Sequence, residues 1–404
     1  MVPPMKTPFP KELCSDCAKK AVELLSALVG AQSINPPGDT REPIRVARDW
    51  LDTHGLPYDI IAANPAKPNI VVRIENGAGP HLVFNAHLDT VPPGERNAWS
   101  FDPLALTERG GRLYGLGTGN MKGAAAAMMF ACRWLALHKA DWNGTVTLTL
   151  VADECVFGPD GAEHLLEARP DVRGDMLICG EGPGAMQLGI GEKGLLWVRL
   201  RATGRVGQGM LTTRGSAATV RIAAAISQID AWNEIRRSPP IAALDHSDNA
   251  EGMRLSANVG WIEGGGFISQ AAANAVADVD FRLPCGMILA DITALLDSLC
   301  RDDGLSWELI KGWEANWSDD GTEVARAVTD AAQEVRGTAP LPVTRLPASD
   351  ASRWRALGIP AVCYGPQPEL ASGVDDYVNS QDFLDCISIY ALAAIRLLPT
   401  QTAE

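Results

Sequence analysis

The sequence predicts an α/β protein with a second, smaller α+β domain inserted into its chain. Before Gly184, short apolar runs rich in β-branched residues alternate with longer segments of helical periodicity. After Gly184 the expected order of elements becomes β-α-β-β-α-β, and the first pattern returns near the C-terminus. A single α/β domain interrupted by an insertion explains this order. Residues 1–187 and 312–404 are expected to form the first domain, and residues 188–311 the second.

The first domain is expected to start with two helices, over residues 12–29 and 43–54, joined by a loop that contains Ser33-Ile-Asn-Pro-Pro-Gly-Asp39. Its strands are expected at four apolar runs, which are residues 70–74, 81–86, 145–151 and 176–179. A helix over residues 121–138 is expected between the second and third runs, and its small residues suit close packing. Strands that alternate with helices favour a sheet covered by helices on both faces.

The inserted domain is expected to contain four strands and two helices. The strands are predicted at residues 195–202, 258–262, 275–282 and 305–310, and the helices at 217–235 and 287–301. Their order is that of the split, ferredoxin-like β-α-β-β-α-β motif. A helix over 323–335, a buried strand and turn from Val362, and a closing helix over 383–398 then complete the first domain.

The composition argues against several classes of protein. The 404 residues are 46% hydrophobic and 21% charged, which is typical of a globular chain of two or three domains. The net charge is −14, with no basic stripe, so we expect no nucleic-acid partner. No apolar run approaches the roughly 18 residues that span a bilayer, and the first residues lack the apolar core of a secretory signal. We therefore expect no membrane partner.

The nine cysteines are odd in number, scattered, and mostly placed inside apolar runs. This pattern favours reduced thiols over a disulfide framework and predicts a cytoplasmic protein. Cys14 and Cys17 form a single Cys-x-x-Cys pair with no second pair nearby. We interpret it as the first turn of a helix, with metal or redox use as the alternative.

Side chains that can bind metals or move protons follow several of the expected strands. His87 and Asp89 come after the second strand, and their alternation places them on one side of an extended segment. Such carboxyl ends commonly carry the ligands and acid–base groups of α/β proteins. Six such residues follow an expected strand or open an expected helix, and they are His87, Asp89, Asn120, Glu154, Cys155 and Glu181. The glycines of Gly115-Leu-Gly-Thr-Gly119 are interpreted as a structural turn, because the nucleotide-binding fingerprint is incomplete.

These motifs, in this order, resemble those of the zinc amidohydrolases that include acetylornithine deacetylase, succinyl-diaminopimelate desuccinylase, aminoacylase and bacterial glutamate carboxypeptidase. The motifs that carry the resemblance are His87-Leu-Asp-Thr-Val-Pro-Pro-Gly94, residues 115–123, Asp153-Glu154, Gly180-Glu181, Gly191-Glu-Lys-Gly194, Asp280-Phe-Arg282, Ser349-Asp350-Ala351 and residues 358–366. The resemblance implies a mixed-sheet, zinc-peptidase-like catalytic domain with an inserted ferredoxin-like domain that serves as a lid and in dimerisation. A homodimer through the inserted domain is therefore expected.

The resemblance also implies roles for individual residues. His87 matches a metal-binding histidine, and Asp89 matches the carboxylate that orients it. Glu154 matches the general base, and Glu181 matches a metal-binding carboxylate. Arg282 matches an arginine of the inserted domain that faces the substrate.

Five positions depart from the family pattern. Asn120 stands where the family has its bridging aspartate, and Cys155 where it has a metal-binding glutamate. Ser372 stands at the position of the late histidine ligand. In the inserted domain, Gln208 replaces a histidine and Ser269 replaces an asparagine.

Charge arithmetic makes these departures important. Two zinc ions about 3.5–4 Å apart carry four positive charges, and here only Glu181 is a certain anion, with Cys155 a second if it is a thiolate. We therefore predict that the paired site is absent. A single zinc, manganese or cobalt ion held by His87, Glu181 and either Asn120 or Cys155 is expected, or none if the site is fully degraded.

Three functions follow. The leading one is hydrolysis of an amide-type C–N bond in a small carboxylated substrate, with Glu154 as general base. Gln208, Arg282, Ser269, Ser372 and Lys193 are the expected substrate contacts. The alternatives are a metal-free enzyme for acyl transfer, amide formation or elimination, in which Asp89 orients His87 and His87 activates Cys155, and a ligand-binding pseudoenzyme. Cys155 as an inert thiol, and Lys122 as a surface charge in the first turn of a helix, are the plain alternatives.

Overall fold

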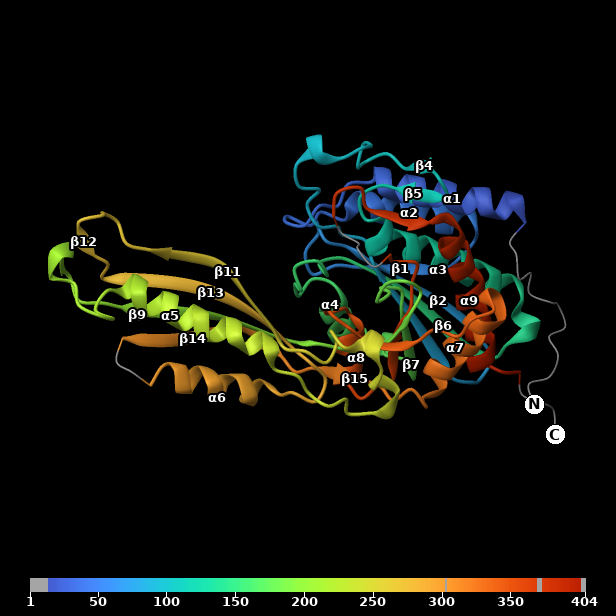
Figure 1. Cartoon of the computed structure of the whole chain (residues 1–404). Coiled ribbons are helices and arrows are strands. Elements are labelled where there is room, and N and C mark those ends of the chain that lie inside the picture. The colour runs from blue at the N-terminus through green and yellow to red at the C-terminus, as the bar shows by residue number, and fades with distance from the viewer. Residues whose placement is uncertain (1–13, 302–303, 369–372, 401–404) are drawn as a thin grey trace. The chain divides into compact units, whose positions relative to one another are not determined.

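The computed structural model describes residues 14–301, 304–368 and 373–400. The chain divides into two compact units (Figure 1). The first contains Met1–Ile190, Ser318–Pro342 and Ser349–Glu404, and the second contains Gly191–Trp317 and Val343–Ala348. The predicted class, α/β with an inserted α+β unit, is confirmed.

A mixed sheet forms the centre of the first unit. Its strands run in the order β1 (Tyr58–Ile61), β2 (Asn69–Asn76), β6 (Gly144–Val151), β3 (His81–His87), β7 (Met176–Cys179), β17 (Ala361–Cys363) and β8 (Leu188–Glu192). The central strand β3 is parallel to both of its neighbours, β6 and β7. These strands are buried along almost their whole length, as expected for parallel strands covered on both faces.

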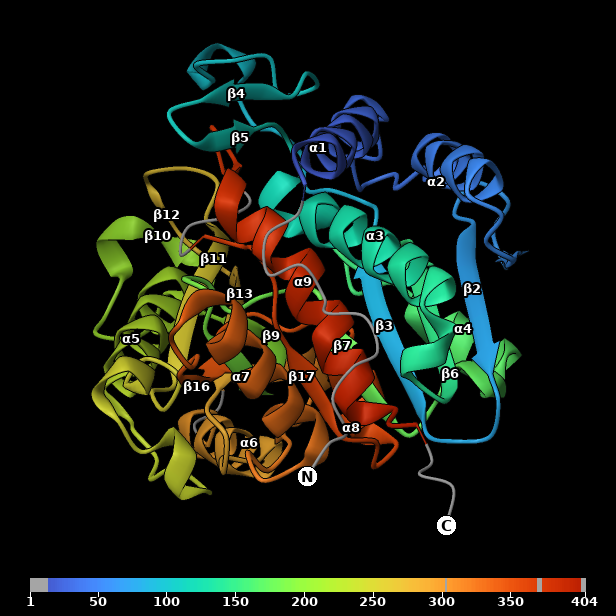
Figure 2. The same ribbon diagram turned by 90° about the vertical axis from the view of Figure 1, so that its right-hand side faces the viewer.

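Two helices lie side by side over this sheet, α3 (Gly123–Leu137) and α9 (Ser380–Leu397), and α7 (Glu323–Arg336) packs against α9 (Figure 2). The first turns of α3 contain four consecutive alanines, all buried, which let the helix approach its neighbours closely. The remaining helices of this unit are α1 (Ser15–Gly30), α2 (Arg41–Thr53), α4 (Ala162–Ala168) and α8 (Ala351–Ala356). Among the described residues, no helix is long and apolar enough to cross a membrane.

The second unit is a four-stranded antiparallel sheet with two helices. The elements follow the predicted order, β9 (Gly194–Thr203), α5 (Ala218–Ala231), β11 (Ser256–Gly264), β13 (Asn274–Leu283), α6 (Leu289–Leu299) and β14 (Leu305–Trp313). The sheet order β11-β13-β9-β14 is that of a ferredoxin-like fold. Alternate residues of β13 are buried, because one face of the sheet packs on α5 and the core while the other stays polar.

Most expected elements lie within a few residues of their predicted bounds, and the differences are at short elements. The strands that the patterns did not indicate are β1, β4 (Thr107–Arg109), β5 (Arg112–Tyr114), β8, β10 (Gly207–Gln208), β12 (Gln270–Ala271), β15 (Asn316–Trp317), β16 (Pro342–Arg345) and β18 (Tyr377–Asn379). Most are too short to show a period of two. Residues 343–348 group with the second unit although they follow it in sequence.

Candidate catalytic centre

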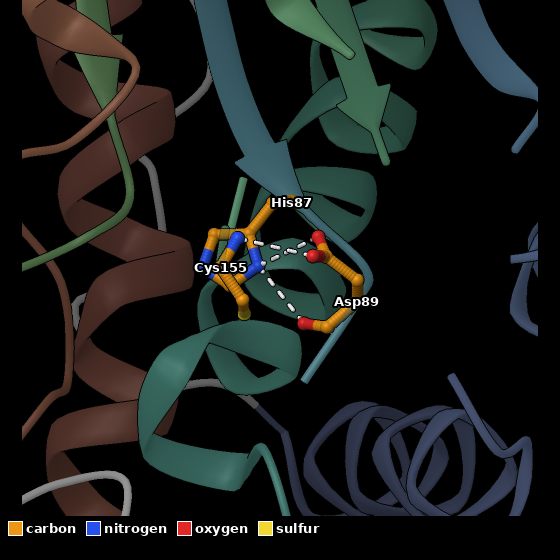
Figure 3. A group of neighbouring side chains, drawn as sticks. All are labelled: His87, Asp89 and Cys155. Atoms are coloured by element: carbon orange, nitrogen blue, oxygen red, sulfur yellow. Dashed lines mark hydrogen bonds and ion pairs between the residues drawn. The ribbon is translucent and has the colours of Figure 1, made fainter. Parts of the chain in front are cut away.

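His87 ends strand β3 and is held in one orientation by Asp89 (Figure 3). Its Nδ1 lies 3.0 Å from the backbone oxygen of Asp89 and 3.4 Å from the Asp89 carboxylate. A carbonyl oxygen only accepts hydrogen bonds, so Nδ1 carries a proton and Nε2 is directed away from Asp89. This hydrogen-bond arrangement is typical of histidines that bind a metal through Nε2.

Nε2 of His87 faces two further side-chain oxygen atoms. It lies 3.0 Å from Oδ1 of Asn120, just before helix α3, and 3.5 Å from Oε2 of Glu154. Burial opposes a charge on the imidazole, but the neighbouring Cys155, Glu154 and Asp89 outweigh it and raise the pKa of His87 well above its ordinary value. In the absence of a cation, the imidazole of His87 is therefore expected to be positively charged, with a second proton on Nε2.

Asp89 is fixed by donors from two other segments. It accepts hydrogen bonds from the Asn35 side chain over 2.8 Å, from the backbone N–H of Glu154 over 3.2 Å and from that of Cys155 over 3.0 Å. Burial would raise the pKa of this carboxyl, but His87 and then Asn35 hold that pKa below its usual range. Asp89 is therefore a carboxylate near neutral pH.

Glu154 and Glu181 come from different strand ends and meet at His87. One ligand atom from each of the three side chains lies within 4.8 Å of the others, and all three are buried. Burial and the charge of Glu181 raise the pKa of Glu154 well above its usual range. Two carboxyls so enclosed either share a proton or require a cation between them.

Asp350, at the start of α8, is a further acidic group of this centre. Burial raises its pKa to about 6, against the opposing charge of Arg353, whose Nε lies 3.5 Å from Oδ1. His87, Glu181 and Asp89 also act on its charge. The motif Ser349-Asp350-Ala351 contributed to the family resemblance, but no sequence pattern indicates that Asp350 lies at the centre.

Cys155 belongs to the same centre but is poorly suited to ionise. Its Sγ and the ligand atoms of His87 and Asp89 lie within 4.8 Å of one another, and Figure 3 draws the three side chains together. Burial, and after it the charge of Asp89, raises the pKa of the Cys155 thiol. The thiol is therefore neutral near pH 7, which removes most of its nucleophilic character and its value as an anionic ligand.

Lys122 corrects one interpretation of the sequence. The sequence predicts a surface charge here, but the irregular turn Thr118–Lys122 places the side chain inside, where it is 1% exposed and donates a hydrogen bond to the backbone oxygen of Ala31 over 2.8 Å. Burial lowers its pKa to about 7, against the opposing effect of Asp89 and Cys155. Sequence periodicity could not show this, because the turn is not a regular helix.

Four expected substrate contacts lie in the second unit, and one of them, Lys193, is buried just before β9. Gln208 pairs with Gln270 in the short β10–β12 ladder, and the backbone oxygen of Ser269 accepts a hydrogen bond from Gly209 over 2.8 Å, so Gln208 and Ser269 lie beside the same ladder. Arg282 is on β13, with its Nε 2.9 Å from Asp280. Ser372 lies outside the described residues.

Arg282 and Gln208 are far apart within the second unit. Strand β12 ends at Ala271, just before β13 starts at Asn274, whereas Arg282 is near the end of β13. Eight residues of extended strand, at ~3.3 Å each, separate Asn274 from Arg282 by about 26 Å. One small substrate cannot contact both side chains of the same chain.

Comparisons with known proteins agree with this geometry. Residues 83–396 match peptidase family M20/M25/M40. Succinyl-diaminopimelate desuccinylase of Stenotrophomonas maltophilia (strain R551-3) is 30% identical over 394 residues, which cover 93% of this chain and 99% of that protein. Aminoacylase-1 of Sus scrofa is 27% identical over 344 residues, covering 80% of this chain and 82% of that protein.

Solved structures share the fold at lower identity. An M20 family metallo-carboxypeptidase from Sulfolobus solfataricus has a TM-score of 0.72 and 19% identity, covering 94% of this chain and all of that one. A dinuclear metal-binding peptidase from Bacillus subtilis has a TM-score of 0.70 and 13% identity, covering 95% of this chain and 99% of that one.

Proposed function

This chain belongs to peptidase family M20/M25/M40, and from this premise we propose that it hydrolyses an amide-type C–N bond in a small carboxylated substrate. We propose further that it uses at most one divalent ion. The observation that carries the proposal is the convergence of His87, Asn120, Glu154 and Glu181 around one buried point. No other group of side chains described above combines a base, a carboxylate pair and an oriented imidazole.

The donor set fits a single ion. His87 Nε2, a carboxylate oxygen of Glu181 and Asn120 Oδ1 would hold it, because nitrogen and oxygen donors of this kind suit zinc, manganese and cobalt. Such an ion would supply Lewis acidity to the scissile carbonyl group. Asp89 supports the arrangement by fixing the proton of His87 on Nδ1.

The charges argue against a second ion. Asn120 is neutral where a bridging anion is needed, and the raised pKa of Cys155 keeps its thiol protonated. Two adjacent dications would then be under-compensated in a buried site. The described residues therefore support a mononuclear centre better than a dinuclear one.

Glu154 is the group proposed to move the proton. Burial and the charge of Glu181 raise its pKa, against the opposing effect of His87, towards the range in which a carboxylate works as a general base. It would take a proton from the attacking water and return it to the leaving nitrogen. Glu154→Gln should therefore abolish turnover, whereas Glu167→Gln, at an exposed position of the same unit, should not.

The second unit supports the proposal of a homodimer. Large apolar side chains are strongly exposed around its β10–β12 ladder, which is typical of a surface that contacts another protein. They are Val206, Met210, Leu211, Phe267 and Ile268. Since Gln208 and Arg282 of one chain cannot reach the same substrate, we propose that each site combines Arg282 of one subunit with Gln208 of the other.

The metal-free alternative is less well supported. Asp89, His87 and Cys155 are close enough for a nucleophilic triad, but the buried thiol would first have to lose a proton against the charge of Asp89. A cysteine nucleophile is usually found where its pKa is lowered. Cys155→Ala tests the alternative, because full activity in this variant would exclude a covalent role.

Metal content per chain tests the leading proposal. Protein purified with zinc and manganese available is expected to hold about one equivalent, which His87→Ala should lose. His164→Ala, a partly exposed histidine of the same unit, is the matched control and should keep the ion. Turnover on a panel of N-acyl amino acids should follow the metal content. Two ions per chain at full occupancy, or full turnover after metal removal, would contradict the proposal.

A further inference from the structure

Two cysteines lie next to each other at the start of helix α1, apart from the catalytic residues described above. Cys14 is the residue just before the helix, Cys17 is in its first turn, and their Sγ atoms are 2.9 Å apart. A disulfide bond is about 2.05 Å long, so the sulfurs need to approach by only about 0.9 Å. The spacing of three residues within a helical turn brings their side chains to one face without a change of backbone.

The two thiols differ in protonation and access. Cys14 Sγ accepts a hydrogen bond from the backbone N–H of Cys17 over 3.3 Å, and Cys14 is exposed whereas Cys17 is half-buried. The hydrogen bond from the Cys17 side chain, and then that from its backbone, lowers the pKa of Cys14, and the same side-chain contact raises the pKa of Cys17. Cys14 is thus the more reactive and the more accessible nucleophile of the pair.

A groove lies further along α1, on the side of the helix that carries Cys17. Lys20, Leu24 and Ala27 follow Cys17 at intervals of three, seven and ten residues, so the four side chains share one side of the helix. The groove has a volume of about 810 Å³, and its other walls include Arg45 and Trp50 of α2 and Arg133 of α3. The guanidinium of Arg133 also favours ionisation of Cys17. The groove is also lined by Glu23, Glu42 and Asp49, and Arg45 pairs with the last two, so its charges are largely balanced. Access to the pair by a small disulfide rests on the exposure of Cys14.

We propose that Cys14 and Cys17 are a redox-active dithiol that exchanges with a low-molecular-weight disulfide. The Cys14 thiolate attacks one sulfur of R–S–S–R, forms a mixed disulfide and releases R–S⁻. Cys17 then gives up its proton, attacks Sγ of Cys14 and releases the second R–S⁻. Two protein thiols are oxidised to one disulfide while R–S–S–R is reduced to two thiols. This inference does not depend on the proposed function.

The test uses the full chain equilibrated with reduced and oxidised glutathione at several ratios. After acid quenching, alkylation and trypsin digestion, residues 12–19 form one peptide that contains both cysteines and no other. At ratios rich in oxidised glutathione, the expected peptide is lighter by two hydrogen atoms and cannot be alkylated. At ratios rich in reduced glutathione, both cysteines should again be alkylated. Cys300→Ser, which removes a half-buried thiol of the second unit, is the matched control and should change nothing.

Single variants test the order of attack. Cys17→Ser should accumulate a glutathione adduct on Cys14, because the resolving thiol is missing. Cys14→Ser should form an adduct on Cys17 at least about tenfold more slowly. A peptide that stays reduced at every ratio would overturn the proposal, and so would a persistent glutathione adduct on Cys14 of the wild-type chain. Equal rates of adduct formation in the two variants would overturn the assignment of Cys14 as the nucleophile.

Discussion

The side-chain amide of Asn35 donates a hydrogen bond to the Asp89 carboxylate over 2.8 Å. Asn35 lies in a loop that precedes Asp89 by more than fifty residues. The same nitrogen lies 3.1 Å from Oδ1 of Asp153, the residue before Glu154. Asn35 therefore joins the carboxylate that orients His87 to the segment that carries the proposed general base. Such outer contacts often decide how well a metal-binding histidine is held.

Asn35→Ala is expected to lower both metal affinity and kcat by roughly ten- to a hundredfold, because Asp89 and Asp153 lose a shared donor. KM should change little, since Asn35 has no expected contact with substrate. Titration with zinc and steady-state kinetics measure the two effects. Asn97→Ala, at an exposed position of the same unit, is the control. Unchanged metal affinity in Asn35→Ala would contradict this role.

Lys67 and Asp153 form a largely buried ion pair, with Nζ 2.5 Å from Oδ1 and the two side chains 15% and 1% exposed. Lys67→Met leaves the Asp153 carboxylate enclosed without its cation, so the free energy of unfolding should fall by about 3 kcal/mol. Urea denaturation at neutral pH measures this loss. Lys67→Met/Asp153→Asn should recover part of it, because no unpaired charge remains. Lys19→Met breaks an exposed pair and should have a negligible effect.

The sequence indicated which residues surround the candidate catalytic centre, because they follow strand ends and neighbouring parallel strands end at the same edge of a sheet. His87, Glu154 and Glu181 could be grouped in this way, and the structure brings their ligand atoms together. Asn35 and Asp350 could not, because each reaches the centre from a loop or short helix whose path depends on tertiary packing. Lys122 was misplaced for the same reason, since an irregular turn has no period that reveals its buried side.

Asp350 gives a pH dependence that can be measured in protein stripped of metal. Its pKa is about 6 in the folded state and 3.8 in the unfolded chain, so the folded state binds more protons between pH 3.8 and about 6. The contribution of this residue to stability therefore falls as pH rises from about 4 to 6. Asp350→Asn should flatten the curve of unfolding free energy against pH in this window, whereas Asp320→Asn, an exposed residue, should not. An unchanged slope in Asp350→Asn would contradict the raised pKa.

The proposed sharing of sites between subunits predicts complementation. Gln208→Ala and Arg282→Ala should each be inactive as homodimers, because every site lacks one contact. In a mixed population half of the dimers contain one subunit of each variant, and one of their two sites is then intact. Activity should therefore recover to about a quarter of the wild-type value after unfolding and refolding the two variants together. No recovery, together with mixed dimers verified by mass, would show that Gln208 and Arg282 act within one chain or not at all.

The number of metal ions should depend on the anions that the centre offers. If the wild-type centre holds one ion because its second position lacks anions, restoring the family pattern should restore the second ion. Asn120→Asp supplies a bridging carboxylate, Cys155→Glu a second one, and Ser372→His the late imidazole. The triple variant is expected to rise from about one to about two zinc equivalents by elemental analysis. Asn120→Asp alone should tighten the first ion without adding another, because Cys155 stays protonated beside Asp89. If the triple variant still bound one ion, the missing anions could not be the cause of the single site.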